Sequence, residues 1–143
     1  MQTGPRITDK GWQMRFAVAS LLVATGYGME EASGKMPMAC ADYGSVACTV
    51  AAHLWIGAFA FASALAMLGL GINGARWWSS WLRFGAWAAL AGMTTVLCWS
   101  AWIDGADPKI RWVPMILIPA YLRLAHDALG DARLAWLYWG RAN

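Results

Sequence analysis

The sequence predicts an all-α polytopic membrane protein, built as an antiparallel bundle of four transmembrane helices. The first observation is composition, because 59% of the 143 residues are hydrophobic and only 13% are charged, a balance unusual for a soluble domain. The second is that apolar residues gather in four stretches, each near the roughly 20 residues that a bilayer-spanning helix needs. The third is the placement of tryptophan and basic residues at the ends of those stretches. Residues 1–143 are therefore predicted to form a single membrane domain.

The first three predicted spans carry almost no charge in their interiors. The first covers about residues 12–29, and the second covers about residues 46–72 with His53 as its sole ionisable side chain. The third, about residues 81–103, has Arg83 at its start. The N-terminal part also has the basic and apolar regions of a signal peptide. No small-x-small cleavage site closes its apolar core, so we expect it to remain as the first helix.

The fourth predicted span, about residues 112–135, is the least regular of the four. It contains Pro114 and Pro119, and proline removes a helical hydrogen bond and favours a kink. We therefore expect this helix to bend at the prolines or to lie partly in the membrane interface. The alternative is that residues 121–139 form an amphipathic helix on the cytoplasmic face, with the charges in water and the aromatic rings among the headgroups.

Basic residues and tryptophans predict the same orientation in the membrane. Lysine and arginine concentrate on the cytoplasmic side of membrane proteins, and indole rings prefer the headgroup zone. Both termini are therefore predicted to be cytoplasmic, and the chain to lie in the cell inner membrane. The residues assigned to the inside are Arg6, Lys10, Arg15, Arg76, Arg83, Arg133 and Arg141, with Trp12, Trp77, Trp78, Trp81, Trp136 and Trp139; those outside are Lys35, Lys109 and Arg111, with Trp99, Trp102 and Trp112.

A stripe of polar residues in the fourth span is the main candidate site. Arg123, His126, Asp127 and Asp131 fall on one helical face by the i, i+3, i+4 rule. Arg123 lies roughly 16 Å from the outer end of the span, close to the middle of a core about 30 Å thick. Charged groups at that depth are costly unless they pair or meet water. The stripe, with His53, is therefore predicted to face the interior and line a polar path, and Arg123 is expected to pair with Asp127.

Histidine offers little support for a haem. The chain has two histidines, His53 and His126, and axial imidazoles are common haem ligands. Their expected depths differ by roughly 10 Å at 1.5 Å per residue, which does not suit two ligands of one haem. We predict no cofactor.

The outer loop between the first two spans combines methionine and cysteine. Met36, Met38 and Cys40 are soft ligands that could hold Cu(I) on a flexible loop. The competing and preferred interpretation is a disulfide between Cys40 and Cys48, because these cysteines are predicted to lie outside the cytoplasm, where oxidising conditions allow the bond.

Enzyme signatures are missing from the sequence: it has no phosphate-binding glycine loop, no G-x-S-x-G, no H-E-x-x-H and no Cys-x-x-Cys. The basic residues are spread along segment ends, which argues against a nucleic-acid partner. We therefore predict a non-enzymatic channel or transporter for ions, protons or a small solute, with the lipid bilayer as its surroundings. Small residues such as Ala58, Ala62 and Ala66 allow close helix packing and a homo-oligomer. The alternatives are an accessory subunit of a larger membrane complex, a phage-type holin or immunity protein, and a copper-handling protein.

Overall fold

The computed structural model of the chain describes residues 10–33, 50–72, 78–104 and 108–142, and these residues contain four α-helices and no strand. The helices are α1 (Lys10–Ala32), α4 (Ala52–Ile72), α5 (Trp78–Ile103) and α6 (Pro108–Ala142). The predicted all-α, four-helix fold is thus confirmed. Three of the helices begin within a few residues of the expected positions; the expected start of α4, residues 46–49, lies outside the described residues.

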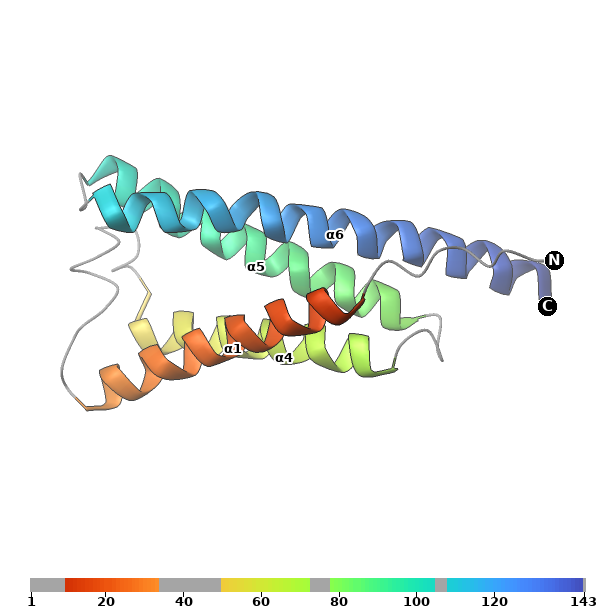
Figure 1. The fold of residues 1–143 in the computed structure, drawn as a ribbon, viewed down its shortest axis with the longest axis horizontal. Helices are drawn as coiled ribbons and strands as arrows, with labels where there is room; N and C mark the ends of the chain where they lie inside the picture. Colours follow the sequence, from red (N-terminus) through yellow and green to blue (C-terminus); the bar gives the residue numbers. More distant parts are fainter. Residues whose placement is uncertain (1–9, 34–49, 73–77, 105–107, 143) are drawn as a thin grey trace.

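The helices run up and down in chain order (Figure 1). α6 packs mainly along α5 and α1 mainly along α4, and the two pairs meet through α4 and α5. Because each helix is antiparallel to the one before it, α1 and α5 begin at the same end of the bundle, where α4 ends. We call this the Arg83 end. The opposite end, where α6 begins, is the Trp112 end. α6 continues past the other helices at the Arg83 end (Figure 1).

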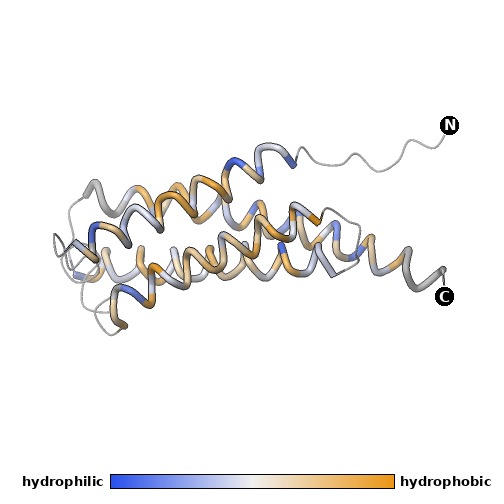
Figure 2. The backbone as a smooth tube through the Cα atoms, turned by 90° about the horizontal axis from the view of Figure 1, so that it is seen from below, coloured by the Kyte–Doolittle hydropathy of each residue, from blue (hydrophilic) through white to orange (hydrophobic). Residues whose placement is uncertain are grey.

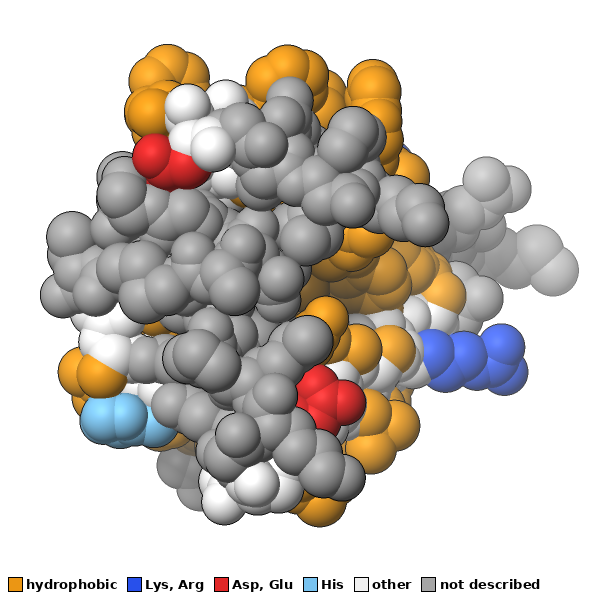
Figure 3. Space-filling view, turned by 90° about the vertical axis from the view of Figure 1, so that its left-hand side faces the viewer, with side chains coloured by type: hydrophobic (Ala, Val, Ile, Leu, Met, Phe, Trp, Pro, Cys, Tyr) orange, Lys and Arg blue, Asp and Glu red, His pale blue; other side chains and the backbone are white. Residues whose placement is uncertain are grey.

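Two of the four helices are long and apolar enough to cross a membrane by length and composition. They are α4, over His53–Ile72, and α5, Trp78–Ile103. Hydrophobic residues recur along all four helices (Figure 2). Large hydrophobic side chains are exposed on every helix, among them Leu22, Phe61, Trp99 and Ile116. At the Trp112 end, the described side chains are mainly hydrophobic around a hollow to the right of centre (Figure 3).

α6 is one continuous helix through both prolines. Proline at positions 114 and 119 removes two backbone N–H donors, yet the helix runs from residue 108 to residue 142 without a break. The bend expected at these residues stays a prediction. Residues 121–132 pack along α5, with Tyr121, Leu124 and Ala132 buried. This segment belongs to the bundle, and the alternative of a surface helix over residues 121–139 is therefore wrong for it.

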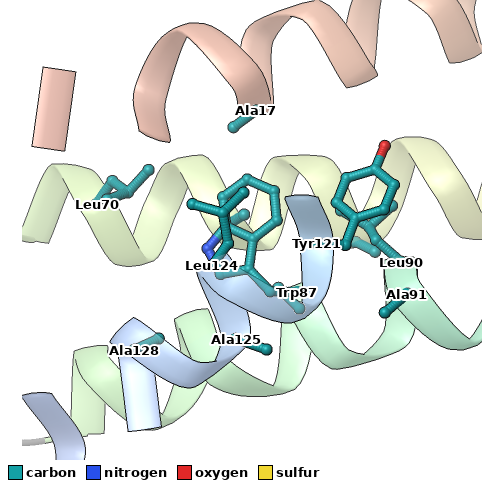
Figure 4. Packing of buried hydrophobic residues seen from close by; sticks show 12 residues of the cluster. Ala17, Leu70, Trp87, Leu90, Ala91, Tyr121, Leu124, Ala125 and Ala128 are labelled. Atoms are coloured by element: carbon teal, nitrogen blue, oxygen red, sulfur yellow. The ribbon is translucent and has the colours of Figure 1, made fainter. Parts of the chain in front are cut away.

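The core combines alanines with a few large side chains (Figure 4). Alanine at the helix contacts allows the backbones to approach closely, and Trp87, Leu90 and Leu124 fill the space between them with at most 2% exposure. Trp87 stacks on Tyr121 with ring centroids 6.1 Å apart. The buried alanines of this core are Ala17, Ala62, Ala66, Ala86, Ala91, Ala125 and Ala128.

Candidate functional site: a buried arginine between α5 and α6

Arg83 is a cation inside the apolar bundle. Its side chain is 1% exposed. Nη2 donates one hydrogen bond of 3.0 Å to Oγ of Ser80, one turn earlier on α5, and a second of 3.0 Å to Oδ2 of Asp131 on α6. The Asp131 side chain is 33% exposed, so the ion pair connects the interior to the edge of the bundle. Such a pair is costly to desolvate and costly to break.

Gly69 of α4 makes room for this arginine. A Cβ atom built at Gly69 would lie 2.6 Å from Cγ of Arg83 and 3.1 Å from the carbonyl oxygen of Ser79. Real Cβ atoms essentially never lie under 3.0 Å from another atom, and a contact of 3.1 Å is unusually tight. The absence of a side chain at position 69 therefore allows α4 to lie directly against the aliphatic part of Arg83, and this contact closes the interior around the guanidinium.

Several buried donors near Arg83 have no hydrogen-bond partner among the described residues. The unpartnered atoms are Nε and Nη1 of Arg83, Nε1 of Trp87, and both the nitrogen and the oxygen of the side-chain amide of Gln13 on α1. Gln13 is 1% exposed and Trp87 is 0% exposed. An unmet buried polar group costs roughly 1–3 kcal/mol, so a native structure normally provides a partner for each.

The helix register brings these groups to one level of the bundle. Trp87 follows Arg83 by one turn on α5 and contacts Phe16 of α1, with ring centroids 6.4 Å apart. Gln13 precedes Phe16 by one turn on α1, and α1 runs parallel to α5 (Figure 1). Gln13 therefore lies at the level of Arg83. In Figure 4 the indole nitrogen lies on the side of the ring toward Leu70, which is the Arg83 end. We call Gln13, Ser80, Arg83, Trp87 and Asp131 the Arg83 cluster.

Lys10 at the start of α1 lies within electrostatic reach of this cluster. Its pKa is lowered from the usual lysine value, first by burial and then by the positive charge of Arg83, while Asp131 acts in the opposite direction. Lys10 precedes the first predicted span, at residues 12–29. Positive charge from two helices therefore converges on the Arg83 end of the bundle.

An aromatic triad closes the other side of the cluster. Phe16, Trp87 and Tyr121 contact one another, with ring centroids 5.4 Å apart for Phe16 and Tyr121. Beyond the triad, toward the Trp112 end, lies a cavity of about 220 Å³ between all four helices. Its walls are mainly apolar, with hydroxyl groups from Ser20, Tyr121 and Thr94. Ser20 and Tyr121 are hydrogen-bonded at 3.0 Å.

The predicted polar stripe on α6 only partly faces the interior. Arg123 and His126 point outward, with side chains 71% and 80% exposed, which corrects the expectation that they face inward. The predicted pair of Arg123 and Asp127 is present, with Nε of Arg123 3.3 Å from Oδ1 of Asp127. Nδ1 of His126 lies 3.7 Å from the same oxygen. Asp131 reaches the interior, because it lies at the edge of the buried face and pairs with Arg83.

His53 lies apart from these residues. It is exposed in the first turn of α4, at the Trp112 end, whereas Asp131 is near the Arg83 end. The structure therefore does not bring His53 together with the α6 residues. Met36, Met38, Cys40 and Cys48, predicted for copper or a disulfide, lie outside the described residues. Within the described residues, no group of three or more His, Cys, Asp or Glu side chains could hold a metal ion, and Cys98 is a buried free thiol.

Arg83, Gln13 and Trp87 were not predicted as site residues. Arg83 was interpreted only as an orientation signal, because it lies near the start of its span. Two sequence signals could have identified it. It is the only charged residue of α5, and the second half of the fourth predicted span offers Asp131 as a counter-ion. Comparisons of the chain with models of protein families, with curated proteins and with solved structures gave no match. The function is therefore inferred from the Arg83 cluster itself.

Proposed function

We propose that this chain is a small, non-enzymatic integral membrane protein that moves a small solute through its four-helix bundle. The observation that carries the proposal is the buried Arg83, a cation with unpartnered donors inside a mainly apolar interior. Ionisable groups at such positions are expensive and typically mark substrate or ion pathways. The apolar exterior and the two helices of spanning composition support a membrane location.

The proposed orientation puts the Arg83 end on the cytoplasmic side of the inner membrane. Lys10, Arg15 and Arg83 lie near that end, and the positive-inside rule assigns such ends to the cytoplasm. Both termini then lie in the cytoplasm. α6, with 35 residues, is about 52 Å long at 1.5 Å per residue. It exceeds a hydrocarbon core of about 30 Å, so its protruding part enters the cytoplasm.

The proposed route has three parts in sequence. The cavity on the Trp112 side receives the solute, the aromatic triad separates it from the interior, and the Arg83 cluster holds it near the cytoplasm. Passage requires Phe16 and Tyr121 to separate. They belong to α1 and α6, which lie in different helix pairs, so a small rocking of one pair against the other opens the triad.

Solute flux into proteoliposomes tests this proposal. We expect Arg83→Gln to reduce flux at least 10-fold, because the side chain that binds the solute is lost. Arg123→Gln is the matched control, since it removes an arginine of the same charge from the exposed face of α6, and flux should stay within 2-fold of wild type. Equal flux for wild type and Arg83→Gln, at equal protein incorporation, would contradict the proposal.

A second candidate function is that of an accessory subunit docked on a larger membrane protein. A specific observation favours it: α5 exposes four small residues, Gly85, Ala88, Ala89 and Gly92, and small residues allow close packing between helices in lipid. In this case, Ala88→Leu should abolish co-purification of the partner, while the more distant Leu68→Ala on the exposed face of α4 should not. Isolation of the chain without any stoichiometric partner from its native membrane would exclude this candidate.

A further inference from the structure

We infer that the Arg83 cluster is a binding site for a small inorganic anion. The inference deepens the proposed function by naming its class of solute, and it rests on that function only for the transport step. The binding site itself stands on the geometry of Arg83, Gln13 and Trp87. Each of these side chains is at least nine-tenths buried and has an unpartnered polar atom.

The chemistry of the unpartnered groups selects an anion. Arg83 offers Nε–H and Nη1–H, Trp87 offers Nε1–H, and Gln13 offers a side-chain NH₂ group. Only the amide oxygen of Gln13 is an unpartnered acceptor among these three residues. A cation or a neutral donor would leave most of these N–H groups unmet. An anion accepts hydrogen bonds from several of them at once, and bonds between a charged donor and an anion are the strong kind.

The described charges around the cluster also suit an anion. Arg83 and Lys10 are cations, and the carboxylate of Asp131 lies within electrostatic reach of both.

The packing restricts the size of the anion. Arg83 is 1% exposed, Gly69 brings the α4 backbone against its stem, and the aromatic triad separates the cluster from the cavity. A bulky organic anion does not fit behind these barriers without separating the helices. The proposed ligand is therefore a small inorganic anion such as chloride or nitrate.

Thermal unfolding of the full chain in detergent tests the inference. Sodium chloride replaces sodium gluconate in steps, at constant sodium concentration and constant pH, so that a small anion replaces a bulky one of the same charge. A ligand that binds only the folded state raises the melting temperature in proportion to the logarithm of its concentration once the site saturates. We expect such a rise for wild type and its loss in Arg83→Gln. Gln13→Leu, which keeps the arginine, should move the half-saturating chloride concentration upward at least 3-fold.

Controls separate site binding from general salt effects. Arg123→Gln should show the same chloride response as wild type, because it changes the exposed charge alone. An equal response in Arg83→Gln and wild type, or no chloride response in wild type, would overturn the inference. The flux measurement and the chloride titration therefore test the transport proposal and the anion site separately. Chloride binding without flux leaves the anion site standing and removes the transport proposal, whereas Arg83-dependent flux of a cation or neutral solute without chloride binding removes the anion site alone.

Discussion

Replacing Asp131 with alanine is expected to lower the free energy of unfolding by about 3 kcal/mol, because it leaves the guanidinium of Arg83 buried without its counter-ion. Arg83 is 1% exposed, and Ser80 becomes its one remaining hydrogen-bond partner among the described residues. The measurement is reversible unfolding by sodium dodecyl sulfate in mixed micelles, followed by circular dichroism. Asp127→Ala is the control on the same helix, since its ion-pair partner Arg123 is 71% exposed.

Removing the other partner of the ion pair, in Arg83→Gln, should lower the free energy of unfolding far less. In Arg83→Gln the remaining carboxylate of Asp131 is one-third exposed and stays hydrated, and the unpartnered guanidinium donors disappear. We expect a loss of about 1 kcal/mol. The double variant Arg83→Met with Asp131→Leu should be close to wild type in stability, since buried ion pairs are often replaceable by apolar side chains. Equal losses for Asp131→Ala and Arg83→Gln would show that the pair is hydrated rather than buried.

Gly69→Ala should lower the free energy of unfolding by about 2 kcal/mol, even though alanine is the better helix former. The new methyl group would meet Cγ of Arg83 at 2.6 Å and the backbone of α5 at 3.1 Å, so α4 must move away from α5. Because this movement displaces the arginine stem, the chloride response should weaken as well. Mixed-micelle unfolding and the chloride titration measure the two effects.

Gly71→Ala supplies the matched control for this prediction. It lies two residues further along α4, and a Cβ atom there would meet nothing within 4 Å. Its stability should be unchanged or higher by up to about 1 kcal/mol, the gain in helix propensity. The same loss in both variants would point to a requirement for flexible glycines near the end of α4, and would contradict close contact with Arg83.

The helical fold was predictable because it depends on local features of the chain. Long apolar stretches separated by polar ones determine where helices form, and the structure has helices at the expected places. The helix of residues 108–142 includes Pro114 and Pro119 without a break and packs along α5. The bend expected there from local propensity stays a prediction.

The candidate site was harder to predict because either of two faces of α6, one charged and one apolar, could have packed toward the interior of the bundle. The charged stripe was expected to turn inward, away from lipid. The structure buries the face with Tyr121, Leu124 and Ala128 instead, where alanine allows close helix packing and the two larger side chains fill the core. The pair of Arg123 and Asp127 was predictable, as it follows from the spacing of four residues within one helix. The pair of Arg83 and Asp131 was not, because its members are 48 positions apart and meet only in the folded bundle.

The continuity of α6 has a mechanical consequence. Ala132 is the last buried residue of α6 among those whose burial is described, which end at Leu137, and Asp131 therefore lies where α6 leaves the bundle. A force applied to the protruding part of α6, where Trp136 and Leu137 are exposed, is transmitted along the helix to Asp131 and so to its salt bridge with Arg83. A protein or a laboratory probe that binds the protruding part of α6 can therefore strain the Arg83–Asp131 ion pair without entering the bundle.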